Sequence, residues 1–268
     1  MEPQPHVTEC IIPGPWSHNQ ESIAEVALCA FVSSECGARA ISTGTATFGP
    51  GARLPYHQHE FSEAVIVLDG EALFAVEGRC YRLQPLDCIH VPSGVAHEVI
   101  NGSDHIRLVA LWAFASPTPT RGLVKDRFIR EDCSYTDPRP DIPENIVRFA
   151  KAPGYELAPG TEFYDLFAGR FGAVGICGGY GKFKPGSSLP CHVHDYDESI
   201  TIVEGEATCE VTGNRYRLSE CDTAFVPASR PHRFINESSN TMAMVWVYAG
   251  SEPTRTIVDV GYCAGSLH

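Results

Sequence analysis

Three residues with metal-binding side chains stand close together at the start of a strand-forming segment. The stretch LPYHQHEFSEAVIVLDG, residues 54–70, places His57 and His59 one residue apart and Glu63 four residues further on. Alternate residues of a β-strand face the same side, so we expect both imidazoles to point into one interior face. Glu63, on or just before the next strand, can meet them there, and His97 can join from a later strand. Imidazole nitrogens with one carboxylate suit a divalent transition metal that keeps open coordination positions.

The same arrangement recurs later in the chain. Residues 189–205 read LPCHVHDYDESITIVEG, in which His192, His194 and Glu198 repeat the first spacing, and His232 follows as the fourth member. Each residue lies 135 positions after its counterpart, since 192 − 57, 194 − 59, 198 − 63 and 232 − 97 give one difference. Three buried imidazoles and a carboxylate without a metal ion would be costly unsatisfied polar groups. We therefore predict one divalent transition-metal site in each copy.

The matching register extends well beyond these residues and identifies an internal duplication. Further pairs at the same offset are Phe48/Phe183, Pro50/Pro185, Gly51/Gly186, Gly70/Gly205, Gly78/Gly213, Tyr81–Leu83/Tyr216–Leu218, Asp87/Asp222, Pro92/Pro227 and Asn101/Asn236. Trp112 matches Trp246 at an offset of 134, so one residue is lost near the end of the second copy. Chance does not hold a register over such a length.

Each copy consists of short segments rich in β-branched and aromatic residues. The segments break at Gly70 and Gly78 in the first copy and at Gly205 and Gly213 in the second, as β-hairpins do. Only residues 141–151 indicate a helix, a short one that would begin at its proline. The pattern predicts an all-β chain with two tandem barrels or sandwiches.

Composition suggests where the units begin and end. We expect an N-terminal arm over residues 1–20, a first domain over 21–117, a linker over 118–154, a second domain over 155–251 and a C-terminal tail over 252–268. The two end segments would pack on either domain or on a neighbouring subunit.

Charge and composition restrict the partners. The chain has 20 basic and 33 acidic residues, a net charge of −13, which disfavours nucleic acid and anionic membranes. A small-molecule substrate is therefore expected, together with pairing into a homodimer. The start MEPQPHVTEC has no signal-peptide pattern and the apolar runs are strand-sized, so we expect a cytoplasmic protein.

The cysteines are expected to be reduced. There are eleven, an odd number without a Cys-x-x-Cys pair, and a secreted disulfide framework would show even, regular pairing. We therefore predict that they pack as small hydrophobic residues, including Cys191 beside His192.

Other polar residues have simpler interpretations. Five histidines fall outside the repeated sets and are expected at the surface or hydrogen-bonded in a core: His6, His18, His90, His105 and His268. Arg82 and Arg217 could clamp a substrate carboxylate, or point outward and pair with the partner domain. Phosphate-binding glycine loops and a nucleophile elbow are absent from the sequence, so kinase and hydrolase functions have no support.

The two blocks, roughly residues 40–115 and 175–250, resemble the cupin superfamily. The frame Gly51, His57-x-His59, Glu63, Gly70 is similar to its first motif, and Pro92-x-Gly94, His97, Asn101 to its second. The second copy matches through Gly186, His192, His194, Glu198, Gly205, Pro227, His232 and Asn236. Leu86 and Cys221 replace a glycine that usually opens the second motif, and Ser229 stands where the first copy has Gly94. The resemblance implies a bicupin: two double-stranded β-helix (jelly-roll) barrels, each with a metal site of three histidines and one glutamate.

Three functions remain open, because one fold supports many chemistries. The first hypothesis is a dioxygenase-type oxygenase acting on a small molecule that chelates the metal, with Fe(II) as the leading ion and Mn, Ni, Zn and Cu as alternatives. Glu63 and Glu198 would serve as ligand, as base, or as both in turn. The second hypothesis is a non-oxidative isomerase, decarboxylase or lyase of an oxo acid. The third is a small-molecule-binding cupin without turnover.

Overall fold

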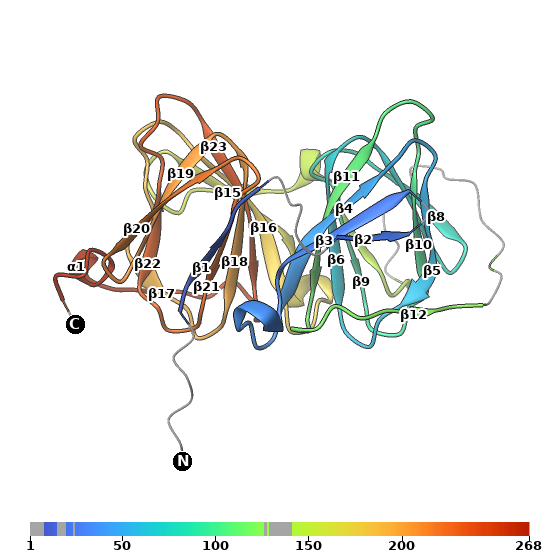
Figure 1. Ribbon diagram of the computed structural model, residues 1–268, viewed down its shortest axis with the longest axis horizontal. Helices are drawn as coiled ribbons and strands as arrows, with labels where there is room; N and C mark the ends of the chain where they lie inside the picture. The colour runs from blue at the N-terminus through green and yellow to red at the C-terminus, as the bar shows by residue number, and fades with distance from the viewer. Residues whose placement is uncertain (1–7, 15–19, 24, 126–127, 129–140, 268) are drawn as a thin grey trace, which may run out of the picture.

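Strands form nearly all the regular structure of this chain. The computed structural model describes residues 8–14, 20–23, 25–125, 128 and 141–267, and places two barrels side by side (Figure 1). Each barrel consists of a seven-stranded and a five-stranded antiparallel sheet. Within the described residues, helix is limited to the turns η1 (Ser34–Cys36), η2 (Phe149–Lys151) and η3 (Gly169–Phe171) and to α1 (Val260–Cys263). None of these could span a membrane. The prediction of an all-β chain with two tandem barrels is confirmed.

The first barrel carries the first predicted metal set. Its larger sheet has the order β13 (Asn145–Val147), β9 (Cys88–Val91), β6 (Glu63–Asp69), β11 (Leu108–Phe114), β4 (Ser42–Phe48), β3 (Val26–Val32) and β2 (Gln20–Ile23). Its smaller sheet has the order β12 (Gly122–Leu123), β5 (Arg53–Gln58), β10 (His97–Asn101), β7 (Ala72–Val76) and β8 (Arg79–Leu83).

The second barrel repeats this arrangement. Its larger sheet has the order β1 (Cys10–Ile12), β21 (Thr223–Val226), β18 (Glu198–Glu204), β23 (Met242–Tyr248), β16 (Cys177–Phe183), β15 (Thr161–Phe167) and β14 (Gly154–Tyr155). Its smaller sheet has the order β20 (Asn214–Ser219), β19 (Glu206–Val211), β22 (His232–Ile235), β17 (His192–Val193) and β24 (Thr256–Ile257).

The two barrels exchange their outermost strands. β1 precedes the first barrel in the chain but pairs with β21 of the second, where Ile11 lies opposite Ala224. β13 precedes the second barrel but pairs with β9 of the first, where Ile146 lies opposite Ile89. Figure 1 shows the blue strand β1 within the red and orange barrel. Part of the expected N-terminal arm and part of the expected linker therefore complete barrels, while the proposed domain boundaries stay a prediction.

The helix expected over residues 141–151 is wrong. This segment forms strand β13 and the 3-10 turn η2. Ile146 is buried in the first core and its backbone continues the sheet edge beside β9. Pairing with an open sheet edge thus overrides the local helical preference of so short a segment.

A hydrophobic cluster and matched hydrogen bonds join the barrels. Leu111 and Ala113 of the first barrel belong to one buried cluster with Phe167 and Val245 of the second. The backbone N–H of Val174 donates to Ser62 Oγ (3.1 Å), and that of Arg39 donates to Asp197 Oδ2 (2.8 Å). Both acceptors and both donors are related by the 135-residue offset, so the interface has approximate two-fold symmetry. Each acceptor directly precedes the glutamate of its metal set.

The turns keep the backbone shape that the repeat predicts. Gly70 and Gly205 have φ of 82° and 74°, the left-handed region in which glycine is unstrained. Leu86, Cys221 and Ser229, which depart from the cupin motif, also have positive φ, at 69°, 76° and 64°. The replacements therefore change the side chain and leave the turn conformation in place.

The expectation that the cysteines are reduced is wrong for part of the chain. Cys191 and Cys263 form a disulfide that joins the segment before β17 to α1, and Cys80 is also disulfide-bonded. Among the cysteines that the structure describes, seven others are free thiols, four of them buried. A pair 72 positions apart has no local spacing signal, because only the return of the C-terminal segment to β17 brings it together.

Candidate metal centres

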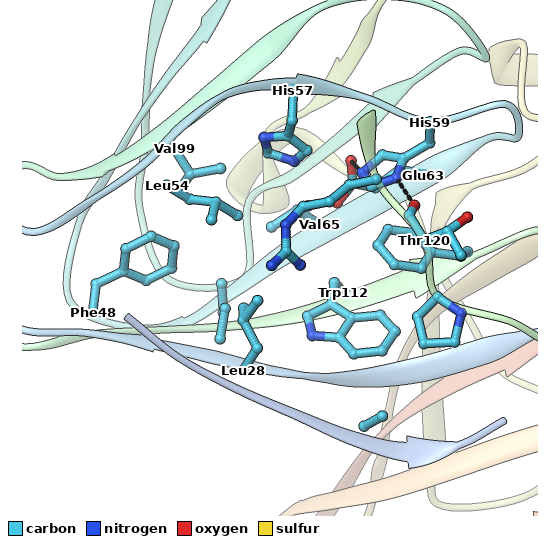
Figure 2. A pocket seen from close by; sticks show the side chains of 16 residues that line it. Leu28, Phe48, Leu54, His57, His59, Glu63, Val65, Val99, Trp112 and Thr120 are labelled. Carbon is cyan, nitrogen blue, oxygen red and sulfur yellow. Dashed lines mark hydrogen bonds and ion pairs between the residues drawn. The ribbon is translucent and has the colours of Figure 1, made fainter. Parts of the chain in front are cut away.

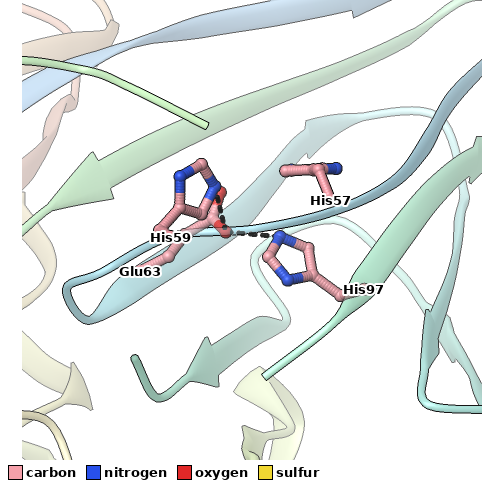
Figure 3. A group of neighbouring side chains, drawn as sticks. All are labelled: His57, His59, Glu63 and His97. Carbon is pink, nitrogen blue, oxygen red and sulfur yellow. Dashed lines mark ion pairs between the residues drawn. The ribbon is translucent and has the colours of Figure 1, made fainter. Parts of the chain in front are cut away.

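The structure brings the four residues of the first predicted set together inside the first barrel. His57 lies on β5, directly opposite His97 on the neighbouring strand β10, and Glu63 begins β6. One ligand atom from each of these residues and from His59 lies within 4.8 Å of all the others. All four side chains are buried, as the alternation of strand residues predicts. Figure 3 shows His59 and His97 directed at Glu63, with His57 beside them.

Backbone carbonyls fix the orientation of the three rings. His57 Nδ1 lies 2.8 Å from the Pro55 oxygen, and His97 Nδ1 lies 3.0 Å from that of Val95. His59 Nδ1 lies 2.5 Å from the oxygen of Thr120. A carbonyl only accepts, so each Nδ1 carries the proton and each Nε2 presents a lone pair. This is the tautomer that metal-binding histidines adopt.

The atoms that converge have no other hydrogen-bond partner. Glu63 Oε2 is 2.7 Å from His97 Nε2 and 3.3 Å from His59 Nε2. All three atoms are buried and make no hydrogen bond of acceptable geometry. Buried polar groups are normally paired, and a cation held between them would satisfy every one. The set therefore fits a divalent metal ion.

The protonation states favour metal binding. Burial, followed by the neighbouring His97, lowers the pKa of His57 to about 3, so this ring is neutral near pH 7. Burial would raise the pKa of Glu63, but the positive charge that His97 and His59 carry when protonated outweighs it and holds that pKa well below its usual value; a bound divalent cation would take the place of that charge. Neutral imidazole and ionised carboxylate are the forms that coordinate metals.

The second barrel repeats the centre almost unchanged. The ligand atoms of His192, His194, Glu198 and His232 also lie within 4.8 Å of one another, and all four side chains are buried. Glu198 Oε2 is 2.5 Å from His232 Nε2 and 3.7 Å from His194 Nε2. The Nδ1 atoms of His192, His194 and His232 face the backbone carbonyls of Pro190, Thr254 and Arg230, respectively, at 2.7–2.8 Å.

One histidine and the glutamate of the second centre have pKa values shifted in the same directions as those of their counterparts in the first. Burial, followed by His232, lowers the pKa of His192 to about 3. Burial would raise the pKa of Glu198, yet His232 and His194 bring it to about 2. Each domain thus contains a site that fits one divalent metal ion.

A cavity of about 200 Å³ adjoins the first centre. His57, His59 and Glu63 form one wall, and the side chains of Leu28, Phe48 and Trp112 lie across from them in Figure 2. The remaining wall is mostly apolar: Ala30, Ala46, Leu54, Val65, Val99, Ala110, Phe114 and Pro119, with Thr120 and Arg121 as further polar residues. An outer groove that includes Ile23, Pro55 and Leu123 shares four residues with the cavity, so the cavity opens beside β12.

Sequence reasoning missed the role of the segments after each barrel. Thr120 and Thr254 supply the carbonyls that orient His59 and His194, and Arg121 lines the first cavity. β12 and β24 then pair with β5 and β17. A signal existed, since Pro-Thr-Arg occurs at residues 119–121 and again at 253–255, the offset of 134 already seen for the tryptophans.

The other singled-out residues serve the scaffold. Arg82 pairs with Glu71 and Arg217 with Glu206 (2.8 Å); each of these partners belongs to the arginine's own barrel and lies away from the cavity, not in the partner domain as the sequence suggested. Asn101 and Asn236 donate to carbonyls of neighbouring loops and face no metal ligand.

The two described histidines outside the repeated sets, His90 and His105, belong to neither centre. His90 is buried and contacts Ser62 Oγ at 3.2 Å, while His105 is exposed. His6, His18 and His268 lie outside the described residues.

Known proteins resemble this chain both in sequence and in fold. The cupin domain family model matches residues 44–114 and 179–248. Quercetin 2,3-dioxygenase of Bacillus subtilis (strain 168) is 30% identical over 104 residues, which are 38% of this chain and 28% of that enzyme. The match thus spans less than a third of the relative's length.

Among solved structures, oxalate decarboxylases superpose well. The Bacillus subtilis enzyme at pH 4.6 matches with a TM-score of 0.75 and 15% identity, over 94% of this chain and 79% of that one. The Lactobacillus farciminis enzyme in complex with formate gives 0.75 and 14%, over 92% and 88%. A further structure of the Bacillus subtilis enzyme, matching at 0.75 and 15% over 94% and 80%, concerns its Mn(II) centres. At such identities the likeness shows the fold alone.

Proposed function

The chain belongs to the cupin family, with one site for a divalent metal in each of its two domains, and from this we propose that it is a metal-dependent oxygenase. Its substrate would be a small organic molecule that chelates the metal through oxygen atoms. The observation that carries the proposal is the mostly apolar cavity against His57, His59 and Glu63. An ion held by these four residues would have room for further ligands, and the cavity is the space through which a substrate and O2 would reach it.

Fe(II) is the ion we propose, and when bound it would supply the electron exchange with O2 that protein side chains cannot. Mn, Ni, Zn and Cu remain alternatives, since the ligand set does not distinguish among them.

The chain's own residues would bind, orient and deprotonate the substrate. Trp112 and Phe114 form the apolar wall beside His59 and keep water away from the reacting atoms. Glu63 lines the same cavity and is ionised near pH 7, so its carboxylate can accept the proton of an enol or phenol hydroxyl that enters the cavity. Partial similarity to a quercetin 2,3-dioxygenase supports chemistry of this class.

A second candidate is a non-oxidative isomerase, decarboxylase or lyase of an oxo acid. The observation that favours it is again Glu63, a buried carboxylate inside a substrate-sized cavity, because proton transfer by such a base requires no O2.

Oxygen uptake separates the two candidates. Protein loaded with Fe(II) should consume O2 in proportion to an added catechol, enol or oxo acid, and His59→Ala should abolish that uptake. A substrate that is converted equally well under strict anaerobiosis would contradict the oxygenase and favour the non-oxidative enzyme. A metal-loaded protein that converts none of these compounds would leave small-molecule binding as its function.

A further inference from the structure

The two metal centres are alike, but the side chains around them differ. Strand pairing aligns the barrels residue by residue: Leu28 and Phe163 lie opposite Ala46 and Gly181, which in turn lie opposite Ala110 and Met244. The residues that line the cavity in the first barrel can therefore be compared one by one with their counterparts in the second barrel.

Larger side chains fill that space in the second barrel. Leu28, Val65, Val99 and Ala110, which line the first cavity, correspond to Phe163, Ile200, Phe234 and Met244. These four larger residues are at most 3% exposed and belong to one continuous hydrophobic cluster with Trp246.

One smaller residue makes room for the largest of them. Gly181 replaces Ala46, and a Cβ added to Gly181 would lie 2.6 Å from the Phe163 ring. The ring therefore occupies the space that a methyl group would need. The region around Phe163 and Gly181 is therefore closely packed, and it does not form a cavity like that of the first barrel.

In the second barrel, the polar residues Asp165, Tyr155 and Arg170 occupy the corresponding side. Where the first cavity is lined by Ala30, the second barrel has Asp165, because Ala30 and Asp165 lie opposite the equivalent glycines Gly44 and Gly179. Tyr155 donates its hydroxyl to Asp165 (2.5 Å), and its ring lies 6.3 Å from that of Phe163. Arg170 pairs with Asp165 as well, so three residues are held over this end of the core.

We infer that substrate binds only at the first centre and that the second centre is a closed metal site with a structural role. The ligand of the first centre would be a single six-membered ring, mostly apolar, with two adjacent oxygen donors for the metal. An apolar cavity of about 150 Å³ admits benzene, so about 200 Å³ admits one ring with small substituents. Leu28, Val99 and Ala110 are then specificity-determining residues. The inference rests on the proposal that substrate coordinates the metal.

The test uses 4-nitrocatechol, whose visible absorption shifts when both oxygens bind a metal ion. The whole chain is loaded with two zinc ions and titrated under nitrogen, so that binding is measured without turnover. Wild-type protein should bind one 4-nitrocatechol per chain. Ala110→Met, which places the second barrel's residue in the first, should weaken binding at least tenfold while both zinc ions are retained. The matched control, Met244→Ala, should leave affinity and stoichiometry unchanged.

A second variant tests the same inference in case Ala110→Met does not fold. Leu28→Phe changes a residue that is only partly buried and should weaken probe binding in the same way. Two bound probes per wild-type chain, no bound probe, or full affinity in a folded Ala110→Met or Leu28→Phe protein would overturn the inference. If one probe binds per chain but no substrate causes O2 uptake, the proposed oxygenase function is wrong, whereas the inference of a single binding site remains supported.

Discussion

The identity of each metal site depends on which ring nitrogen of each histidine is left free. In all six cases a backbone carbonyl faces Nδ1, so Nε2 is the atom left free, and in His59, His97, His194 and His232 it lies within 3.7 Å of the glutamate. Such outer contacts hold the ring in place and raise its basicity as a ligand. These backbone contacts therefore fix the ring orientations that metal binding requires.

Removing one imidazole from either set tests this directly. His59→Ala and His194→Ala should each lower the metal content of purified protein by about half, since a structural change in one barrel leaves the other set complete. Elemental analysis after purification without added metal measures the effect. His105→Ala, at an exposed position outside both sets, is the control. Unchanged metal in either ligand variant would mean that its barrel does not hold an ion.

At the scale of elements, short strands after each barrel hold the centres together. β24 pairs with β17, and just before it the carbonyl of Thr254 orients His194. The chain then continues into α1, where Cys263 is bonded to Cys191, the neighbour of His192. The C-terminal segment is thus part of the second centre, although it contributes no ligand.

Loss of this disulfide should weaken the second barrel. Cys263→Ala releases a cross-link between residues 72 positions apart, and we expect the free energy of unfolding to fall by about 2–4 kcal/mol. Denaturant unfolding without reductant measures the difference, with Cys221→Ala, at a free cysteine of the same barrel, as the control. Equal stability of Cys263→Ala and wild type would show that α1 contributes nothing through this bond.

At the scale of the whole molecule, the two barrels form one structure. They exchange β1 and β13, share a buried cluster and are joined by hydrogen bonds to Ser62 and Asp197. Because each acceptor is next to a metal-set glutamate, the contact between barrels also supports the start of β6 and β18. We therefore expect one cooperative unfolding transition.

Asp197 offers the sharpest test of that coupling. Its two oxygens accept the N–H groups of Arg39 (2.8 Å) and Ala228 (3.1 Å), and Asp197→Ala would leave both donors without this acceptor. A fully buried unsatisfied donor costs about 1–3 kcal/mol, and these two bonds are only partly buried, so we expect the free energy of unfolding to fall by about 1–3 kcal/mol for Asp197→Ala and by less for Asp197→Asn. Unfolding should be followed with a chelator present, so that metal binding does not contribute. An alanine variant as stable as wild type would argue against a coupled interface.

Much of this protein was predictable from the sequence because its signals are local or repeated. The metal ligands were predictable from side-chain identity and spacing, and the structure brings each set of four together. The all-β fold follows from strand periodicity, and the duplication follows from a constant offset. The predicted helix failed because Ile146 meets a sheet edge far away in the sequence.

Only the tertiary structure decided what surrounds the metal sites. The carbonyls of Thr120 and Thr254 are backbone atoms that every residue possesses, so no residue type marks them. The exchange of β1 and β13 and the bond between Cys191 and Cys263 depend on which distant segments meet. The cavity beside the first centre is what remains after many side chains have packed, and that sum of volumes cannot be read from any single position.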